Sequence, residues 1–328
     1  MNLDEKKHSV LAIVVPCYNE SEMFSECLAQ LRNVIFRLIG KSLISSSSYI
    51  LFVDDGSTDD TWHQISQAAL NFDNIRGLKL SRNKGHQAAL QAGLRYSDAD
   101  MTISIDADLQ DDVTAIDTMV DAYHNGYEIV YGVRDERTTD SFFKRNTATL
   151  FYKTMSYLGV QQIEQHADYR LLGRKALNAF LDFNEKNLYI RGIIPLLGFT
   201  STKIYYSRKA RLAGESKYPL KKMLSLALDG ITSLSIKPLR IISFLGFFVS
   251  LISFFIGFTA LIQKLLGHTI EGWASVMVGL FFMGGVQLLC IGILGEYIGK
   301  IYVEVKNRPS FFVEKFMSKD SLHEEENN

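Results

Sequence analysis

The stretch from residue 101 to residue 112 reads MTISIDADLQDD. It starts with strand-forming residues and then turns polar, with an Asp-x-Asp pair at Asp106 and Asp108 and with Gln110 close behind. An Asp-x-Asp at the end of a strand can present two carboxylates to a divalent cation and its bound phosphates, because Mg²⁺ and Mn²⁺ prefer oxygen ligands. Acidic surface loops have a similar composition, so the surrounding sequence must decide between a metal site and a surface loop.

The same order, a short apolar run followed by polar residues, occurs twice earlier in the chain. Residues 11–15 (LAIVV) precede PCYNE, and residues 49–53 (YILFV) precede DDGS. Residues 75–80 predict a further strand, and amphipathic stretches between the strands predict helices at 21–38, 59–69 and 85–96. This alternation predicts an α/β, Rossmann-like, mostly parallel sheet that binds ligands at the carboxyl ends of its strands. Three strands thus bring carboxylates to one edge.

Several classes of protein are excluded by what the sequence lacks. No Gly-x-Gly-x-x-Gly turn follows the first strand and no Gly-x-x-x-x-Gly-Lys-Ser/Thr loop occurs, which argues against dehydrogenases and P-loop enzymes. The net charge of −1 argues against a nucleic-acid partner bound by bulk charge. The three cysteines show no paired spacing, so a disulfide framework or a zinc site is not expected.

Two long apolar runs lie near the C-terminus, at residues 241–266 and 273–298. Each exceeds the roughly 20 residues that cross a bilayer as a helix, and the alternative is a pair of buried core helices. The short polar connection at 267–272 predicts a helical hairpin. The outer ends of the hairpin carry basic residues, namely Lys237, Arg240, Lys300, Lys306 and Arg308. By the positive-inside rule, these ends and both chain termini are expected to be cytoplasmic.

We therefore expect four parts in the chain. Residues 1–212 form the cytoplasmic catalytic domain, 213–238 interfacial amphipathic helices, 239–299 two transmembrane helices, and 300–328 a cytoplasmic tail. Within the tail, RPSFFVEKF at 308–316 has β-type residues, and we expect it to fold back onto the first domain. Small-residue spacing in the second apolar run is compatible with a homo-oligomer.

The ordered motifs PCYNE, VDDGSTD, SRNKGHQAAL and DADLQDD resemble those of family 2 inverting glycosyltransferases with a GT-A fold. More narrowly, they are similar to the polyprenyl-phosphate glycosyltransferases, which include bactoprenol glucosyltransferases and dolichyl-phosphate mannose synthases. The resemblance covers essentially the whole chain and continues through HADYRLLGRKA, YIRGIIPLLGF, RKARLAGESKY and the two-helix anchor. One departure is Asp112, where the family usually has proline. We expect little effect, because aspartate is also favoured at a helix start.

The resemblance implies how a nucleotide sugar is bound. Pro16, Tyr18 and Glu20 would contact the nucleoside and ribose, Asp54 or Asp55 would recognise the base, and Lys84 would offset diphosphate charge. Mg²⁺ or Mn²⁺ would be held by Asp106, Asp108 and Gln110. The metal would neutralise charge on the departing nucleoside diphosphate.

A polyprenyl monophosphate acceptor is already ionised at neutral pH, so we expect catalysis without a strong general base. Asp168 matches the position of a base in related transferases; the alternative is a buried pair with Arg170. His86 either approaches phosphate or is a surface histidine at a helix start. The acceptor phosphate could be bound by basic residues that could equally bind anionic lipid head groups, namely Arg134, Arg137, Arg208, Arg211 and Lys217.

The resemblance thus implies an enzyme of the inner membrane that moves glucose from UDP-glucose to undecaprenyl phosphate. The product would be a lipid-linked sugar for cell-envelope glycan modification, such as that of O-antigen in lipopolysaccharide, with a flippase as a partner in the same pathway. Alternatives are another sugar (mannose, N-acetylglucosamine or an aminoarabinose derivative) or a non-catalytic membrane scaffold. A processive polysaccharide synthase would carry Gln-x-x-Arg-Trp, which is absent.

Overall fold

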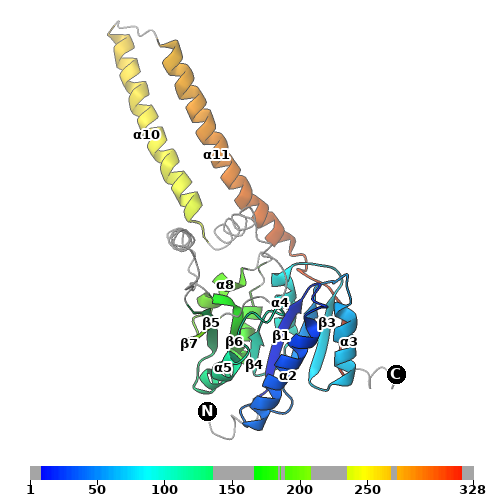
Figure 1. The fold of residues 1–328 in the computed structure, drawn as a ribbon. Helices are drawn as coiled ribbons and strands as arrows, with labels where there is room; N and C mark the ends of the chain where they lie inside the picture. Colours follow the sequence, from blue (N-terminus) through cyan, green and yellow to red (C-terminus); the bar gives the residue numbers. More distant parts are fainter. Residues whose placement is uncertain are drawn as a thin grey trace. The chain divides into compact units, whose positions relative to one another are not determined.

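The computed structural model describes residues 9–135, 166–183, 185, 189–207, 235–266 and 272–319. It divides into two compact units. The described part of the first unit comprises residues 9–207 with the gaps just given and residues 309–319, and that of the second comprises residues 235–266 and 272–308. The first unit carries the sheet with its helices, and the second carries two long helices (Figure 1).

The first unit is built on an eight-stranded sheet in the order β7-β5-β6-β4-β1-β2-β3-β8. Its strands are β1 (Leu11–Cys17), β2 (Tyr49–Asp54), β3 (Ile75–Leu80), β4 (Met101–Ser104), β5 (Ile129–Arg134), β6 (His166–Gly173), β7 (Ser201–Tyr206) and β8 (Val313–Met317). The neighbours β4-β1-β2-β3 are parallel, as are β5 and β7. Strand β6 is antiparallel to both β4 and β5. The predicted α/β class with a mostly parallel sheet is confirmed.

Every residue of β1 and β2 is buried, which explains why these strands read as continuous apolar runs. The helices are α2 (Phe24–Gly40), α3 (Thr61–Asn71), α4 (His86–Tyr96), α5 (Ala115–His124), α7 (Arg174–Leu181) and α8 (Ile190–Ile193), with a 3-10 turn η1 (Ile194–Leu197). Helix α2 buries a stripe at helical spacing that includes Cys27, Leu31 and Ile35. It begins three residues later than predicted, since residues 21–23 form a turn in which the Glu20 carbonyl accepts from the amides of Met23 and Phe24.

Strand β8 shows that the segment after the second long helix does return to the sheet, as predicted. It pairs antiparallel with β3, with Met317 opposite Gly77 and Lys315 opposite Lys79. Glu314 forms an ion pair of 3.0 Å with Lys79, and the ring centroid of Phe316 lies 5.9 Å from that of Tyr96. The sheet is therefore completed by residues near the far end of the chain.

The second unit contains α10 (Lys237–Leu265) and α11 (Trp273–Lys306). Both helices are long and apolar enough to cross a membrane, and none of the side chains in their most apolar windows is buried. Exposed apolar surface of this extent argues against the alternative of core helices in a water-soluble fold. Helix α11 is capped after Lys306 by Asn307, whose φ of +45° is left-handed and whose amide donates to the Glu304 carbonyl. Of the segment predicted to form interfacial helices, residues 213–234 lie outside the described residues.

Candidate active site

The loop after β1 and the loop after β2 are joined by hydrogen bonds at the carboxyl edge of the sheet. The Asn19 side-chain oxygen accepts from the Thr58 amide at 2.9 Å, and the Asn19 amide donates to Ser57 Oγ at 3.0 Å. Asn19 adopts φ of +54°, a left-handed conformation that asparagine tolerates better than most residues. Among the residues predicted to bind the nucleoside, Pro16 is buried in β1, Glu20 is half-buried, and the Tyr18 side chain is 46% exposed.

The two aspartates that end β2 make different contacts. The Asp55 carboxylate accepts from the backbone amides of Lys84 at 2.7 Å and Gly85 at 2.8 Å, so both of its oxygens hold the loop before α4. Among the described residues, the hydrogen-bond partner of the Asp54 carboxylate is Ser57, whose amide lies 3.3 Å from each oxygen. Burial raises the pKa of both carboxyls. The side chain and amide of Ser57 oppose the rise at Asp54, and the amides of Lys84 and Gly85 oppose it at Asp55. Of the two, Asp54 therefore has more capacity left for a ligand.

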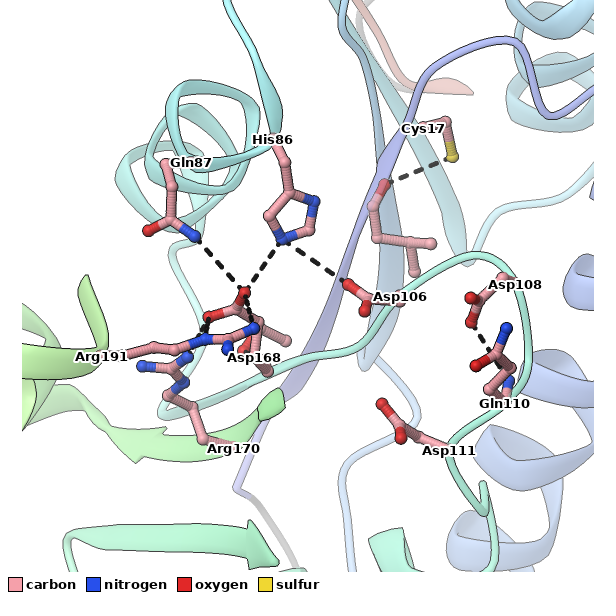
Figure 2. Close-up of polar contacts among 12 residues, drawn as sticks. Cys17, His86, Gln87, Asp106, Asp108, Gln110, Asp111, Asp168, Arg170 and Arg191 are labelled. Atoms are coloured by element: carbon pink, nitrogen blue, oxygen red, sulfur yellow. Dashed lines mark hydrogen bonds and ion pairs between the residues drawn. The ribbon is translucent and has the colours of Figure 1, made fainter. Parts of the chain in front are cut away.

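The loop after β4 carries Asp106, Asp108 and Gln110 (Figure 2). It turns through Leu109, whose φ is +52°. In this turn the Gln110 amide donates to Asp108 Oδ1 at 3.2 Å. Asp106 Oδ1 is a buried atom with no hydrogen-bond partner among the described residues. Burial, together with the nearby carboxylates of Asp168 and Asp111, raises the pKa of Asp106 to about 6, although His86 opposes the rise.

The donor set of this loop fits the Mg²⁺ or Mn²⁺ implied by the resemblance. Among the described residues, no three His, Cys, Asp or Glu side chains converge as a complete metal cage. Mg²⁺ is usually held by one or two protein carboxylates together with substrate phosphates and water. Oδ1 of Asp106, which accepts no hydrogen bond from a described residue, and the carboxylate of Asp108 are such a partial set, which phosphates of a substrate would complete.

Asp168, on β6, is the centre of the polar network drawn in Figure 2. Its carboxylate is paired with the fully buried Arg170, and it accepts from Arg191 Nη2 at 2.9 Å and Nε at 3.3 Å. His86 Nε2 lies 3.2 Å from Asp168 Oδ2 and 3.6 Å from Asp106 Oδ1, so His86 links the two aspartates. The structure therefore contains the buried Asp168–Arg170 pair that was the alternative to a catalytic base.

The charge state of Asp168 follows from these contacts. Burial alone would raise its pKa, but the hydrogen bond with His86 and the two arginines outweigh burial and hold the pKa well below its usual value. At neutral pH the carboxylate is therefore ionised, and its oxygens already accept from several donors. Such a group is a poor general base, because it has little affinity for a proton.

A second buried carboxylate, Asp111, lies at the end of the same loop. Asp111 Oδ1 accepts from Arg134 Nε at 3.1 Å and Nη2 at 3.0 Å, and from the Tyr206 hydroxyl at 2.7 Å. Arg134 was predicted to bind acceptor phosphate, and the structure places it at the end of β5 with this partner. The other predicted phosphate ligands lie outside the described residues, namely Arg137, Arg208, Arg211 and Lys217.

Three residues of this region were not predicted as site residues: Arg191, Asp111 and Tyr206. Arg191 lies 23 residues from Asp168 and Tyr206 lies 95 residues from Asp111, so no local pattern indicates either pair. Asp111 could have been predicted as a site residue, since it directly follows Gln110 in the acidic run.

Comparison with known proteins places this geometry in context. The profile of the family described as Glycosyl transferase family 2 matches residues 12–181, and the profile described as GtrB C-terminal hairpin matches residues 237–301. An uncharacterized glycosyltransferase of Bacillus subtilis (strain 168), YkoT, is 51% identical over 312 residues, which cover 94% of this chain and 93% of the relative.

A bactoprenol glucosyl transferase of Shigella phage SfII is 38% identical over 307 residues, covering 93% of this chain and 97% of the relative. Among solved structures, the crystal structure of a mycobacterial protein aligns over 70% of this chain and 75% of its own, with 17% identity and a TM-score of 0.48.

Proposed function

Because the chain belongs to glycosyl transferase family 2, we propose that this glycosyltransferase moves glucose from UDP-glucose to undecaprenyl phosphate. The choice of sugar and lipid is supported by the similarity to a bactoprenol glucosyl transferase along nearly the full length of both chains. Mannose, N-acetylglucosamine or an aminoarabinose derivative are the alternatives to glucose.

The observation that carries this proposal is the state of Asp168. A hydroxyl acceptor must lose a proton to attack, which calls for a base, whereas a lipid phosphate is already ionised near neutral pH. Arg170, Arg191 and His86 all contact the Asp168 carboxylate, so Asp168 is not free to act as the base and positive charge lies at the centre of the site. That arrangement suits an anionic acceptor, for which positioning and charge neutralisation supply catalysis.

In the proposed reaction, an oxygen of the lipid phosphate forms a bond to the anomeric carbon. The bond from that carbon to the diphosphate breaks, and UDP leaves with the electron pair. Attack opposite to the leaving group inverts an α-linked donor into a β-linked product. A bound Mg²⁺ or Mn²⁺ would stabilise the charge of the departing diphosphate.

We assign the donor and acceptor roles as follows. Tyr18 is exposed and can contact the nucleoside beside Pro16 and Glu20, and the buried Asp54 has remaining hydrogen-bond capacity at the end of β2. The ligands proposed for the metal are Asp106, Asp108 and Gln110, with Lys84 near the diphosphate. Arg134 faces the acceptor phosphate.

We also propose that α10 and α11 are membrane spans, with the first unit and both termini on the cytoplasmic side of the inner membrane. The exposure of both apolar helices and the match to the GtrB hairpin support the spans. The basic residues at the outer ends of the two helices support the orientation. This side is where undecaprenyl phosphate and UDP-glucose would meet.

The test is transfer by the purified full-length protein in detergent. The protein is incubated with undecaprenyl phosphate, Mg²⁺ or Mn²⁺, and each of a panel of labelled nucleotide sugars, and label in lipid is measured. We expect label from UDP-glucose above all other donors. Label from another donor alone would replace glucose with that sugar, and no label from any donor would refute the proposal.

Two variants test the site within the same assay. Asp108→Ala should reduce transfer by at least about a hundredfold, because a carboxylate facing the metal is lost. Asp112→Asn is the matched control: it removes a carboxylate of the same loop that contacts only Thr114 among the described residues. The control should retain transfer near the wild-type rate. Full activity of Asp108→Ala would remove the metal assignment.

A further inference from the structure

We propose that Asp111 is a positioning residue that fixes the guanidinium of Arg134 for the phosphate of the lipid acceptor. This inference rests on the proposed function, because it assigns a task within the transfer to lipid phosphate. It adds a residue to the machinery that makes no contact with either substrate and acts through Arg134.

The topology first places the partners at the working edge of the sheet. Strand β6 is antiparallel to both β4 and β5, so β5 runs in the same direction as β4, and β7 is parallel to β5. Arg134 is the last residue of β5, and Tyr206 is the last residue of β7. Both side chains therefore start from the edge at which β4 delivers Asp106.

The contacts of Asp111 fix the orientation of Arg134. Asp111 is 2% exposed, and Oδ1 alone receives all three donors: Arg134 Nε, Arg134 Nη2 and the Tyr206 hydroxyl. With two guanidinium nitrogens on one oxygen, the plane of Arg134 is determined by Asp111. A buried acceptor with several donors is costly to rearrange, so this orientation is held before any substrate binds.

Arg134 nevertheless keeps a side for a ligand. Its side chain is 30% exposed, and its hydrogen bonds with Asp111 use Nε and Nη2, so Asp111 does not engage Nη1. A guanidinium presents its donors in a rigid fork that matches phosphate oxygens. Once Asp111 fixes one edge of the fork, the direction of the remaining donors is also fixed.

The position of Asp111 is itself supported by two tyrosines. Tyr206 is buried, and its ring lies edge-on to that of Tyr169, with centroids 5.2 Å apart. The Tyr169 hydroxyl donates to the carbonyl of Asp112, next in the chain, at 3.0 Å. The loop that carries Asp106 and Asp108 is thus attached to β6 and β7 at Asp111 and Asp112. One loop therefore aligns the metal side and the acceptor side of the reaction.

The test separates the binding of acceptor from that of donor. In the full-length protein, Asp111→Ala removes the acceptor oxygen and lets Arg134 turn toward water. We expect the KM for undecaprenyl phosphate to rise roughly tenfold to a hundredfold, as for other misplaced groups, and the KM for UDP-glucose to stay within about twofold. Asp111→Asn keeps an oxygen at the position of Oδ1 and should restore most of the loss.

A double-mutant cycle tests whether the effect passes through Arg134. Arg134→Ala should show the same rise in acceptor KM, and Asp111→Ala should add little to it, because the residue that Asp111 positions is already gone. Asp117→Ala is the matched structural control. It breaks another Arg–Asp pair, in which Asp117 Oδ1 lies 2.6 Å from Arg37 Nη2, and should lower the thermal midpoint without changing either KM.

The outcomes are distinct. The positioning role is wrong if Asp111→Ala raises the KM for UDP-glucose as much as the KM for undecaprenyl phosphate. It is also wrong if the acceptor KM of Asp111→Ala equals that of Asp111→Asn, or if Asp111→Ala raises the acceptor KM of Arg134→Ala by its full effect. Where Asp111→Ala does not fold, Tyr206→Phe removes one donor and leaves the carboxylate, and should still raise the acceptor KM selectively. An unchanged acceptor KM in that variant counts against the inference.

A binding measurement separates this inference from the proposed function. Affinity for undecaprenyl phosphate is compared with that for undecaprenol, which lacks the phosphate, in the wild type and in Asp111→Ala. If the wild type transfers no sugar, the proposed function fails, and selective loss of phosphate-dependent binding in Asp111→Ala still supports the inference. If the wild type transfers sugar but phosphate-dependent binding is equal in both proteins, the inference alone fails.

Discussion

At the scale of single residues, two aspartates that contact the same histidine have opposite titration behaviour. Asp168 is paired with Arg170 and Arg191, and its pKa lies well below the usual value. Asp106 is half-buried, its buried Oδ1 lies near other carboxylates, and it forms no ion pair with an arginine among the described residues, so its pKa is raised to about 6. Asp168 is therefore ionised at neutral pH, whereas the charge of Asp106 changes with pH near neutrality.

The raised pKa of Asp106 predicts a pH dependence of stability in the absence of metal. The folded-state value of about 6 lies above the unfolded value of roughly 4, so the folded protein holds an extra proton between the two. This contribution to stability is fully present below about pH 4 and is lost as pH rises through 6. Asp106→Asn, which stays neutral, should therefore gain in thermal midpoint relative to the wild type between pH 5 and 7.

The measurement is thermal unfolding of both proteins in a chelator at intervals from pH 5 to 8. Asp98→Asn serves as control. Burial alone would raise the pKa of Asp98, but the hydrogen bond from Tyr49 and the charge of Arg76 outweigh burial and lower this pKa. Asp98 is therefore ionised throughout this pH range. Its difference from the wild type should not vary with pH. A flat difference for Asp106→Asn would contradict the assigned environment.

At the scale of elements, β8 is the strand whose loss should be most informative. It covers the outer edge of β3, buries Met317 and supplies Glu314 to Lys79. A chain that ends after residue 311 would leave β3 as an unpaired edge strand, so we expect a lower thermal midpoint and a greater tendency to aggregate. A chain that ends after residue 319 keeps β8 and is the control. Equal midpoints for the two chains would show that β8 adds nothing to stability.

Local patterns explain which elements could be predicted. Strands β1 and β2 were predictable because they are buried on both faces and therefore apolar throughout. The Asp168–Arg170 pair was also within reach, since residues two apart on a strand lie on one face. The clusters around Arg191 and Tyr206 were not, because each joins segments that only the folded sheet brings together. The order of residues along the chain does not show such long-range contacts.

At the scale of the whole molecule, the average composition combines two unlike parts. A mean hydropathy of +0.04 results from a charged unit that carries the site and from two apolar runs, 241–266 and 273–298, whose charged residues are Lys264 and Glu296 alone. The net charge of −1 likewise averages over acidic residues near the metal loop and basic residues at the outer ends of the hairpin. Such a separation of charge would suit an enzyme that binds a soluble nucleotide sugar in one part of the chain and a membrane lipid in another.

The proposed orientation predicts which side of the membrane the hairpin turn faces. In a Cys290→Ser background, where the remaining Cys17 and Cys27 are buried, Thr269→Cys should react with a membrane-impermeant maleimide in intact cells. Ser318→Cys, placed after β8, should react only after the cells are permeabilised. The reverse pattern, or equal labelling of both positions, would overturn the orientation.

The pairing of β3 with β8 has a consequence for how the protein is made. Lys79 and its partner Glu314 are 235 residues apart, and both apolar helices lie between them in the chain. During synthesis the ribosome therefore releases β3 long before its partner strand exists, and its edge stays uncovered until both helices have been made. The catalytic unit can be finished only on a chain that already carries the complete hairpin, which links maturation of the enzyme to the order of translation.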